Sequence, residues 1–285
     1  MTVRDLKSKI LKRLEAGGIQ EAETEARIIL TEYAHVSVSD IFSDPEKELE
    51  DEAIVKSIEA VLERRCSGVP LQHIIGKTGF MGFDFRVSPS ALIPRPDTEI
   101  LAEEALKDHH DGSRILDLCT GTGCIIISLM ALTNDCYGVG TDISDAALEL
   151  ASENADMILS EKRERLELKQ GDLYDALEDD DLFDVIVSNP PYIRTSDIES
   201  LSTEVRDHDP RIALDGGADG LEFYRRIIKG AKEHLRKGGD LLLEIGYDQA
   251  EDVSEMMRNN GFIEVQTVKD FGGNDRVVRG ILSAL

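Results

Sequence analysis

A short apolar strand that ends in an amide, two prolines and a ring is the first candidate for chemistry. Residues 185–187 form a β-branched run typical of a strand covered on both faces, and Asn189-Pro190-Pro191-Tyr192 follows. Prolines donate no backbone hydrogen bond and push the preceding residue towards extended geometry, so strand pairing must stop there. We expect a rigid strand end that presents one amide side chain, free backbone carbonyls and one aromatic ring. Such groups can position a substrate.

A glycine-containing turn is the second candidate. It covers residues 117–123, between an expected strand and helix, and carries Gly121 and Gly123. Glycine lets a ligand approach the backbone closely, and the first strand–helix turn of a doubly wound sheet is where adenosine-containing ligands lie. Asp142 follows about twenty residues later, at the end of the next expected strand, where a carboxylate can hold both ribose hydroxyls.

This spacing fits either a nicotinamide dinucleotide or S-adenosylmethionine. Ile126 stands where the third glycine of a dinucleotide motif would be, which favours a ligand without pyrophosphate. Asp172, after the third expected strand, could accept from an adenine amino group, with Leu173 covering the ring. The alternative for Asp172 is a helix cap or a turn residue, and its local sequence leaves both open.

The elements that must position these groups alternate between strand and helix from residue 92 onward. Strands are expected at 114–118, 137–141, 166–169, 184–188, 240–245, 263–269 and 276–282. This alternation predicts an α/β, doubly wound and mostly parallel seven-stranded sheet with helices on both faces. Gly272-Gly273-Asn274 joins the last two strands, so the sheet should end antiparallel.

The first part of the chain differs in character. Residues 1–68 have helical apolar spacing, with a third helix predicted to start at Ser43-Asp44-Pro45. Alternating apolar residues near Phe83 and Phe85 predict a half-buried hairpin. We expect an N-terminal helical substrate-binding domain at 1–75, a β-hairpin connector at 76–93 and a catalytic domain at 94–285.

Composition limits the possible partners. The formal net charge of −25 argues against tight nucleic-acid binding, because phosphate contacts need clustered Lys and Arg. The four cysteines, Cys66, Cys119, Cys124 and Cys136, have no zinc-type spacing, so no metal site and a reduced protein are expected. Residues 1–20 lack the apolar core of a signal peptide, and no run has the length of a membrane span. We expect a cytoplasmic protein.

Together these motifs resemble the class I S-adenosylmethionine-dependent methyltransferases, which have a Rossmann-like fold. The Asn189 to Tyr192 tetrad is similar to that of enzymes that methylate planar amide or amino nitrogens. Within this group the match is closest to the release factor glutamine methyltransferases (the HemK/PrmC type). Further stretches that carry the resemblance are residues 70–76, 92–99 and 244–246, with Gln249. The resemblance covers essentially the whole chain.

The resemblance implies S-adenosylmethionine as cofactor, S-adenosylhomocysteine as product and, as substrate, the glutamine of the Gly-Gly-Gln motif in peptide chain release factors, a step in translation termination. The implied cofactor-binding residues are Cys119, Thr120, Gly121, Thr122, Gly123, Asp142, Ile143, Asp172, Leu173 and Asn189. Cys119 stands where the family usually has glycine, and Leu173 stands where an aromatic residue is common.

We assign catalytic roles to Asn189, Pro190 and Tyr192, with Pro191 as a further substrate-binding residue. An amide nitrogen is a poor nucleophile because its lone pair is delocalised into the carbonyl. The Asn189 side-chain oxygen and the Pro190 carbonyl could accept from its two N–H groups and aim the nitrogen at the methyl carbon. Tyr192 could lie against the flat amide. Catalysis would then rest on positioning and preorganised electrostatics, without an identifiable general base.

The main alternative is an adenine-amino (N6) methyltransferase that acts on DNA or RNA. Such an enzyme must extract a base and grip phosphates, and the acidic balance counts against this. A nicotinamide-dependent oxidoreductase is disfavoured by the glycine pattern, and a non-catalytic adenosine-binding module by the tetrad. We therefore expect a monomer that acts on release factors, without stable binding to nucleic acid or membranes.

Overall fold

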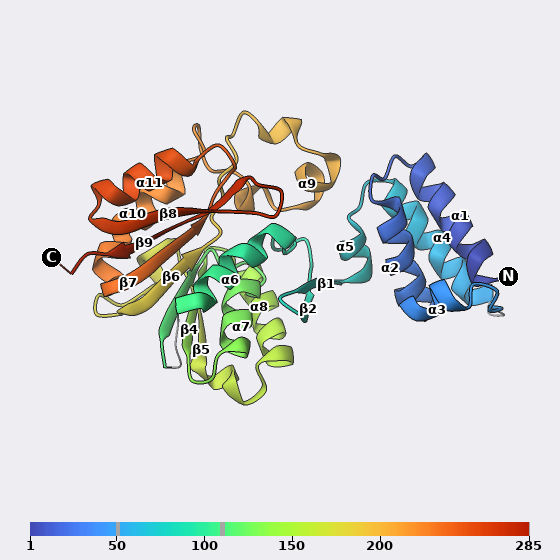
Figure 1. The fold of residues 1–285 in the computed structure, drawn as a ribbon, viewed down its shortest axis with the longest axis horizontal. Helices are drawn as coiled ribbons and strands as arrows, with labels where there is room; N and C mark the ends of the chain where they lie inside the picture. Colours follow the sequence, from blue (N-terminus) through green and yellow to red (C-terminus); the bar gives the residue numbers. More distant parts are fainter. Residues whose placement is uncertain (50–51, 109–111, 285) are drawn as a thin grey trace. The chain divides into compact units, whose positions relative to one another are not determined.

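The N-terminal unit, residues 1–76, is helical in the computed structural model, which describes residues 1–49, 52–108 and 112–284 (Figure 1). Its helices are α1 (Val3–Ala16), α2 (Ala22–Ala34), α3 (Val38–Ser43), α4 (Glu52–Cys66) and α5 (Leu71–Ile75). The apolar side of α1 lies in the core of the unit, at residues 3, 6, 10 and 14. Thr2 and Asp5 form a capping box that satisfies orphan N–H groups at the start of α1.

The predicted helix start at residues 43–45 is wrong. The helix α3 ends there, and α4 begins at Glu52. The segment between them serves the start of α1, because the carbonyl of Pro45 accepts from Arg4 N at 2.9 Å and that of Lys47 from Val3 N at 3.0 Å. The first N–H groups of a helix lack intrahelical partners, so tertiary pairing overrides the local Ser-Asp-Pro signal.

The second unit, residues 77–285, is built on a seven-stranded sheet. Its strands are β3 (Arg114–Leu118), β4 (Tyr137–Asp142), β5 (Leu166–Gln170), β6 (Phe183–Ser188), β7 (Leu235–Glu244), β8 (Phe262–Lys269) and β9 (Asp275–Leu282). They lie in the order β5-β4-β3-β6-β7-β9-β8. Neighbouring strands from β5 to β7 are parallel, while β9 is antiparallel to both β7 and β8. The predicted fold class is confirmed, including the antiparallel end.

Helices cover both faces of this sheet (Figure 1). One face packs against α6 (Glu99–Asp108), α7 (Cys124–Leu132) and α8 (Asp145–Ile158), and the other against α10 (Glu222–His234) and α11 (Ala250–Asn259). The remaining helix is α9 (Thr203–His208), and short 3-10 turns include η1 (Pro96–Thr98), η2 (Ser160–Arg165), η3 (Leu173–Ala176), η4 (Ile198–Ser200) and η5 (Arg211–Ala213). Among the described helices, none combines the length and apolarity that a bilayer crossing requires.

The predicted hairpin is formed by β1 (Lys77–Phe80) and β2 (Phe83–Arg86). Phe80 and Phe85 are both buried and meet edge-to-face, with ring centroids 6.1 Å apart. They join the core that contains α6 and α7, so the hairpin belongs to the second unit. Alternation therefore marks the core-facing side of a hairpin here, with Phe83 only half-buried.

The strand register aligns the carboxyl ends of the central strands. Leu118 lies opposite both Thr141 and Ser188, and Ser188 lies opposite Leu243. The residues that follow these strands must therefore emerge at one edge of the sheet. In open parallel sheets this edge is where ligands bind.

A buried cation ties the antiparallel strand to its neighbours. Arg279 of β9 donates from Nη2 to Asp240 Oδ1 of β7 at 2.9 Å and from Nη1 to Glu104 Oε1 of α6 at 3.3 Å. All three side chains are at most 10% exposed. Burial of the two carboxylates costs desolvation free energy, which this guanidinium offsets together with the exposed Lys107, a second partner of Glu104.

Replacing Arg279 by Met should lower the free energy of unfolding by about 3–5 kcal/mol, because the buried Asp240 and Glu104 side chains lose this guanidinium, while Glu104 keeps its pair with the exposed Lys107. Denaturant unfolding of the second unit measures the change. Arg236→Met is the matched control, since Arg236 pairs with Asp184 at an exposed site, and it should cost less than about 1 kcal/mol. Equal losses in the two variants would contradict this account.

Candidate active site

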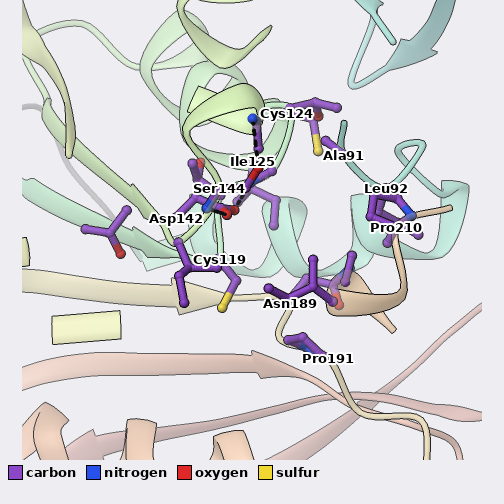
Figure 2. A pocket seen from close by; sticks show the side chains of 18 of the residues that line it. Ala91, Leu92, Cys119, Cys124, Ile125, Asp142, Ser144, Asn189, Pro191 and Pro210 are labelled. Carbon is purple, nitrogen blue, oxygen red and sulfur yellow. Dashed lines mark hydrogen bonds between the residues drawn. The ribbon is translucent and has the colours of Figure 1, made fainter. Parts of the chain in front are cut away.

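One pocket lies at the carboxyl edge of the sheet (Figure 2). Its lining comes from the turns after β3, β4, β5 and β6, together with segments 90–98 and 210–213 and helix α10. The residues predicted from sequence that line it are Cys119, Thr120, Gly121, Thr122, Asp142, Ile143, Asp172, Leu173, Asn189 and Pro191. The structure thus brings together side chains that are up to 72 positions apart in the sequence.

Asp142 is fixed at both carboxylate oxygens. Oδ2 accepts from Gly121 N and Oδ1 accepts from Ser144 N, each at 2.9 Å (Figure 2 labels Asp142 and Ser144). Burial raises the pKa of this carboxyl, whereas the Ser144 and Gly121 N–H groups lower it. A carboxylate oxygen can accept more than one hydrogen bond, so both oxygens retain capacity for a pair of ligand hydroxyls.

Gly123 is the one predicted cofactor residue that does not line the pocket. It precedes α7 with φ +77°, and an added Cβ would lie 2.6 Å from Ile127 Cδ1 and 3.2 Å from Ala151 Cβ. This glycine therefore allows α7 to start close against α8. Its position shapes the turn from behind the pocket.

Two non-glycine residues that line the pocket have left-handed backbone conformations. Cys119 has φ +60° and Leu173 has φ +57°, a region that L-residues with a side chain rarely occupy. Burial raises the pKa of the Cys119 thiol well above its usual value, and the nearby charges of Asp142 and Asp117 add to this. The thiol is therefore neutral and unsuited to nucleophilic chemistry.

Asp172 lies where the pocket meets α10. Its Oδ2 is 2.7 Å from Arg226 Nη2, and it makes no side-chain capping hydrogen bond at η3. Asp172 thus occupies the N-cap position of η3, as the alternative allowed, and its carbonyl accepts from Asp175 N at 3.2 Å, but its carboxylate is directed at a guanidinium. Arg226 and Phe223 of α10 both line the pocket. They were not predicted, because nothing in the local sequence of this distant helix indicates that it contacts the pocket.

Asn189 is oriented by η1. Its Nδ2 donates to Thr98 Oγ1 at 3.2 Å, and Thr98 is only 2% exposed. The amide nitrogen is thereby used within the protein, so the amide oxygen is the group left for the pocket that Asn189 lines. Thr98 belongs to the 92–99 stretch that carries the family resemblance, and this stretch was the available signal for its importance.

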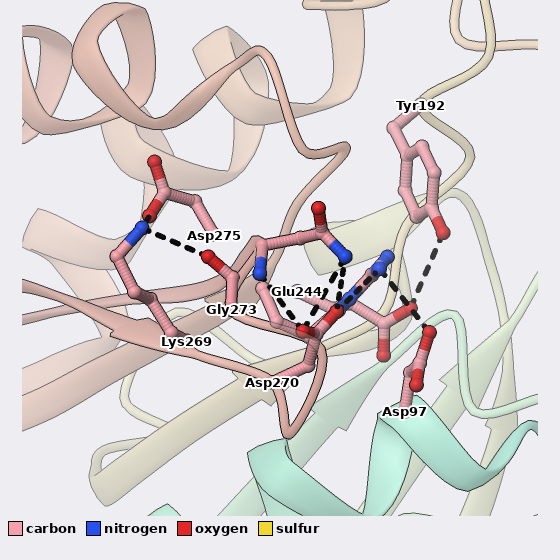
Figure 3. Close-up of polar contacts among 9 residues, drawn as sticks. Asp97, Tyr192, Glu244, Lys269, Asp270, Gly273 and Asp275 are labelled. Carbon is pink, nitrogen blue, oxygen red and sulfur yellow. Dashed lines mark hydrogen bonds and ion pairs between the residues drawn. The ribbon is translucent and has the colours of Figure 1, made fainter.

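Pro190 and Tyr192 do not line the pocket. The Tyr192 hydroxyl donates to Glu244 Oε1 at 3.3 Å (Figure 3), and the Tyr192 backbone carbonyl accepts from Gln249 Nε2 at 3.1 Å. Burial, followed by the charge of Glu244, raises the pKa of Tyr192 well above its usual value. Gly216 packs on the backbone here, since an added Cβ would lie 2.7 Å from Tyr192 Cα. The tetrad is therefore held from several sides.

The segment after α9 borders the pocket through an ion pair. Arg95, which lines the pocket, pairs with Asp209, whose side chain is fully buried. Burial raises the pKa of Asp209, whereas the charge of Arg95 lowers it. Pro210 and Ile212, which follow Asp209, line the pocket. Within the described ranges, no group of three His, Cys, Asp or Glu side chains is arranged to hold a metal ion.

Glycine at position 119 should fit the observed backbone better than alanine. Both Cys119→Gly and Cys119→Ala remove the thiol, but only glycine adopts φ +60° without a Cβ penalty. We expect the glycine variant to unfold with a free energy about 1 kcal/mol greater than the alanine variant. Denaturant titration of the two variants measures the difference. A more stable alanine variant would contradict the prediction.

Comparison with known families divides the chain in the same order as its structure. A model of the PrmC N-terminal domain matches residues 5–76, and a model of the methyltransferase small domain matches residues 96–205. A methyltransferase structure from Pyrococcus furiosus superposes with a TM-score of 0.53 at 19% identity, covering 71% of this chain and 90% of that one. At this identity the superposition supports the fold alone.

Curated relatives extend the match over nearly the full length. The release factor glutamine methyltransferase of Caulobacter vibrioides is 41% identical over 96% of this chain and 94% of its own. That of Cereibacter sphaeroides is 39% identical over the full length of both chains. The resemblance inferred from the motifs is confirmed, and the chain belongs to the release factor glutamine methyltransferase family.

Proposed function

We propose that this protein is an S-adenosylmethionine-dependent protein-(glutamine-N5) methyltransferase that methylates the Gly-Gly-Gln glutamine of peptide chain release factors. The observation that carries the proposal is the Asn189 amide, whose nitrogen is held by Thr98 at the margin of the pocket that contains Asp142. Its oxygen is then the group available to a substrate amide. The identity of the substrate is inferred from the names of the relatives. The accessible Asn189 oxygen gives a physical reason why an amide group would bind at this site.

The donor set of the pocket fits S-adenosylmethionine, which supplies a methyl group on a positively charged sulfur. Asp142 offers two preorganised carboxylate oxygens for the ribose hydroxyls. Asp172 and Leu173 are suited to the adenine, and Gly121 leaves the backbone accessible, since an added Cβ would have 3.9 Å to its nearest neighbour. We further propose that the enzyme needs no metal and acts as a monomer.

The mechanism that we propose is positioning. Asn189 Oδ1 and the Pro190 carbonyl accept from the two N–H groups of the substrate amide and hold the nitrogen towards the methyl group. Tyr192 limits rotation of the flat amide, with its ring fixed through its hydroxyl and its backbone carbonyl. Preorganised acceptors of this kind cost no reorganisation during the reaction. The pocket lining contains no histidine or lysine, and we propose that the amide proton leaves to water after methyl transfer.

The helical N-terminal unit is the part of the chain that we assign to release factor binding. Its described helices enclose a core of their own, and the pocket lining comes entirely from the second unit. A separate unit can therefore select the protein substrate while the tetrad selects the chemical group. The fine choice between release factors would then depend on its surface.

The proposal predicts one methyl group on the glutamine-containing peptide of a release factor. Purified protein, labelled S-adenosylmethionine and release factor are incubated, and the tryptic peptides are analysed by mass spectrometry. A parallel reaction with DNA and RNA is the control for an N6-adenine methyltransferase. Label in nucleic acid and none in the release factor would overturn the proposed substrate.

Alanine substitutions at positions 189 and 142 should change different quantities, the first kcat and the second the Kd for S-adenosylmethionine. Asn189→Ala removes an acceptor for the substrate amide, so kcat should fall about 100- to 1000-fold while the Kd for S-adenosylmethionine stays within about threefold. Asp142→Ala removes the ribose acceptors, so the Kd itself should rise about 10- to 100-fold. Calorimetry and single-turnover kinetics measure both quantities. Near-normal turnover by Asn189→Ala would refute its role.

A further inference from the structure

The turn after β5 brings no aromatic ring into the pocket. Leu173 follows Asp172 at the start of η3, and its side chain is branched and only 5% exposed. Tyr174, the next residue, does not line the pocket. Proteins commonly bind a nucleic-acid base by stacking it on an aromatic side chain. A stacking surface for adenine beside Asp172 therefore has to come from another element.

Helix α10 contributes two side chains to the lining of this pocket. Phe223 and Arg226 both line it, as does Asp172. They are three residues apart, so they lie on the same side of the helix. Phe223 is half-buried, and Arg226 Cζ lies 5.8 Å from the centroid of its ring. The beginning of α10 thus brings an aromatic ring and a guanidinium to the pocket.

Close packing between α10 and η3 fixes the position of these two side chains. The Tyr174 hydroxyl of η3 donates to the Ile227 carbonyl of α10 at 2.9 Å. An added Cβ on Gly230 would lie 2.5 Å from Tyr174 Cδ2, so the helix approaches the tyrosine as closely as a glycine allows. Residues 223, 226, 227 and 230 share one side of α10, because they are three, four and seven positions apart. The contact with Tyr174 therefore also holds residues 223 and 226 at the pocket.

Arg226 contacts one oxygen of the Asp172 carboxylate and leaves the other. Its Nη2 lies 2.7 Å from Asp172 Oδ2, and no hydrogen bond joins Oδ1 to the described residues. The two side chains are 39% and 40% exposed, and ion pairs that are this exposed contribute little to stability. The pair is therefore better suited to fixing the direction of the carboxylate than to stabilising the fold. Oδ1 keeps its capacity to accept from a ligand.

We propose that Phe223 and Arg226 of α10 form the adenine-binding wall of the pocket. The Phe223 ring packs against the face of the adenine. Arg226 is a positioning residue, which holds Asp172 Oδ2 so that Oδ1 accepts from the adenine amino group. This inference rests on the proposed function, and it assigns the recognition of a 6-amino purine to a helix about fifty residues beyond the turn that carries Asp172.

The first test measures the Kd for S-adenosylhomocysteine by calorimetry, which requires no release factor. Phe223→Tyr keeps an aromatic ring at this position, and Phe223→Leu removes it. We expect the Kd of the leucine variant to be about 5- to 50-fold higher than that of the wild type, and the Kd of the tyrosine variant to stay within about threefold. Equal Kd values in Phe223→Leu and the wild type would overturn the stacking role.

The second test compares two neighbouring arginines with two ligands. Arg226→Met removes the partner of Asp172, and Arg225→Met is the matched control, because Arg225 pairs with Asp219 at an exposed site and does not line the pocket. The ligands are S-adenosylhomocysteine and its purine riboside analogue, which has hydrogen in place of the amino group. In the wild type and Arg225→Met the analogue should bind about tenfold more weakly, because it cannot donate to Asp172.

In Arg226→Met this ratio of the two Kd values should fall at least about threefold, because the Asp172 carboxylate is no longer held in one direction. A merely structural residue would weaken both ligands equally, and an unchanged ratio in Arg226→Met would overturn its positioning role.

These outcomes can be separated from the proposed function. A wild type that binds S-adenosylhomocysteine with the expected ratio, but leaves the release factor unmodified, would overturn the proposed reaction and support the adenine site. A wild type that binds neither ligand would overturn both. Wild-type binding by Phe223→Leu and Arg226→Met, in a protein that methylates the release factor, would overturn this inference alone.

Discussion

The parallel register of β4, β3, β6 and β7 is the constraint on which the rest of the structure depends. It brings residues 119, 142, 189 and 244 to one edge of the sheet, although none is close to another in the sequence. A different local feature follows each of three strands where its pairing ends. These are a left-handed residue at 119, a carboxylate held by backbone N–H groups at 142, and prolines at 190 and 191. The chemistry of the site follows from the side chains and backbone groups that remain accessible at these strand ends.

Burial of carboxylates at this edge costs stability, and the chain offsets the cost locally. Burial raises the pKa of Asp117 to about 7, and the Thr120 hydroxyl, which donates to Asp117 Oδ2 at 2.6 Å, acts against this. Arg95 pairs with Asp209, whose side chain is fully buried, and Arg226 pairs with the partly exposed Asp172, each from an element that is distant in sequence. A formal net charge of −25 therefore says little about the site, where cations are placed individually against buried anions. The net charge mainly describes the surface of the protein, whereas the site has its own charge balance.

Much of the fold could be predicted because strand and helix alternate with clear apolar runs, and the turns after β3, β4 and β6 carry distinctive residues. What escaped prediction depends on tertiary contact. Thr98 lies in the 92–99 stretch that carries the family resemblance, but nothing local indicates that its hydroxyl accepts from Asn189. Arg226 and Phe223 lie on a helix about fifty residues beyond the turn that they cover. The false helix start at 43–45 has the same cause, since those carbonyls serve α1.

Cys119 and Leu173 differ from the residues that are usual in the family, and the surrounding structure explains why these differences are tolerated. A side chain at such φ costs about 1–2 kcal/mol, and the surroundings hold the backbone in place. Thr141 supports both turns, because its hydroxyl donates to the Leu173 carbonyl at 3.2 Å and its carbonyl accepts from Thr120 N at 3.0 Å. The backbone conformation of these two turns is thus set by β4 and its neighbours. A change of side chain at 119 or 173 therefore alters stability more than it alters the backbone conformation. The amide at 189 has no such backbone substitute, because the role that we propose for it depends on the direction of one oxygen atom.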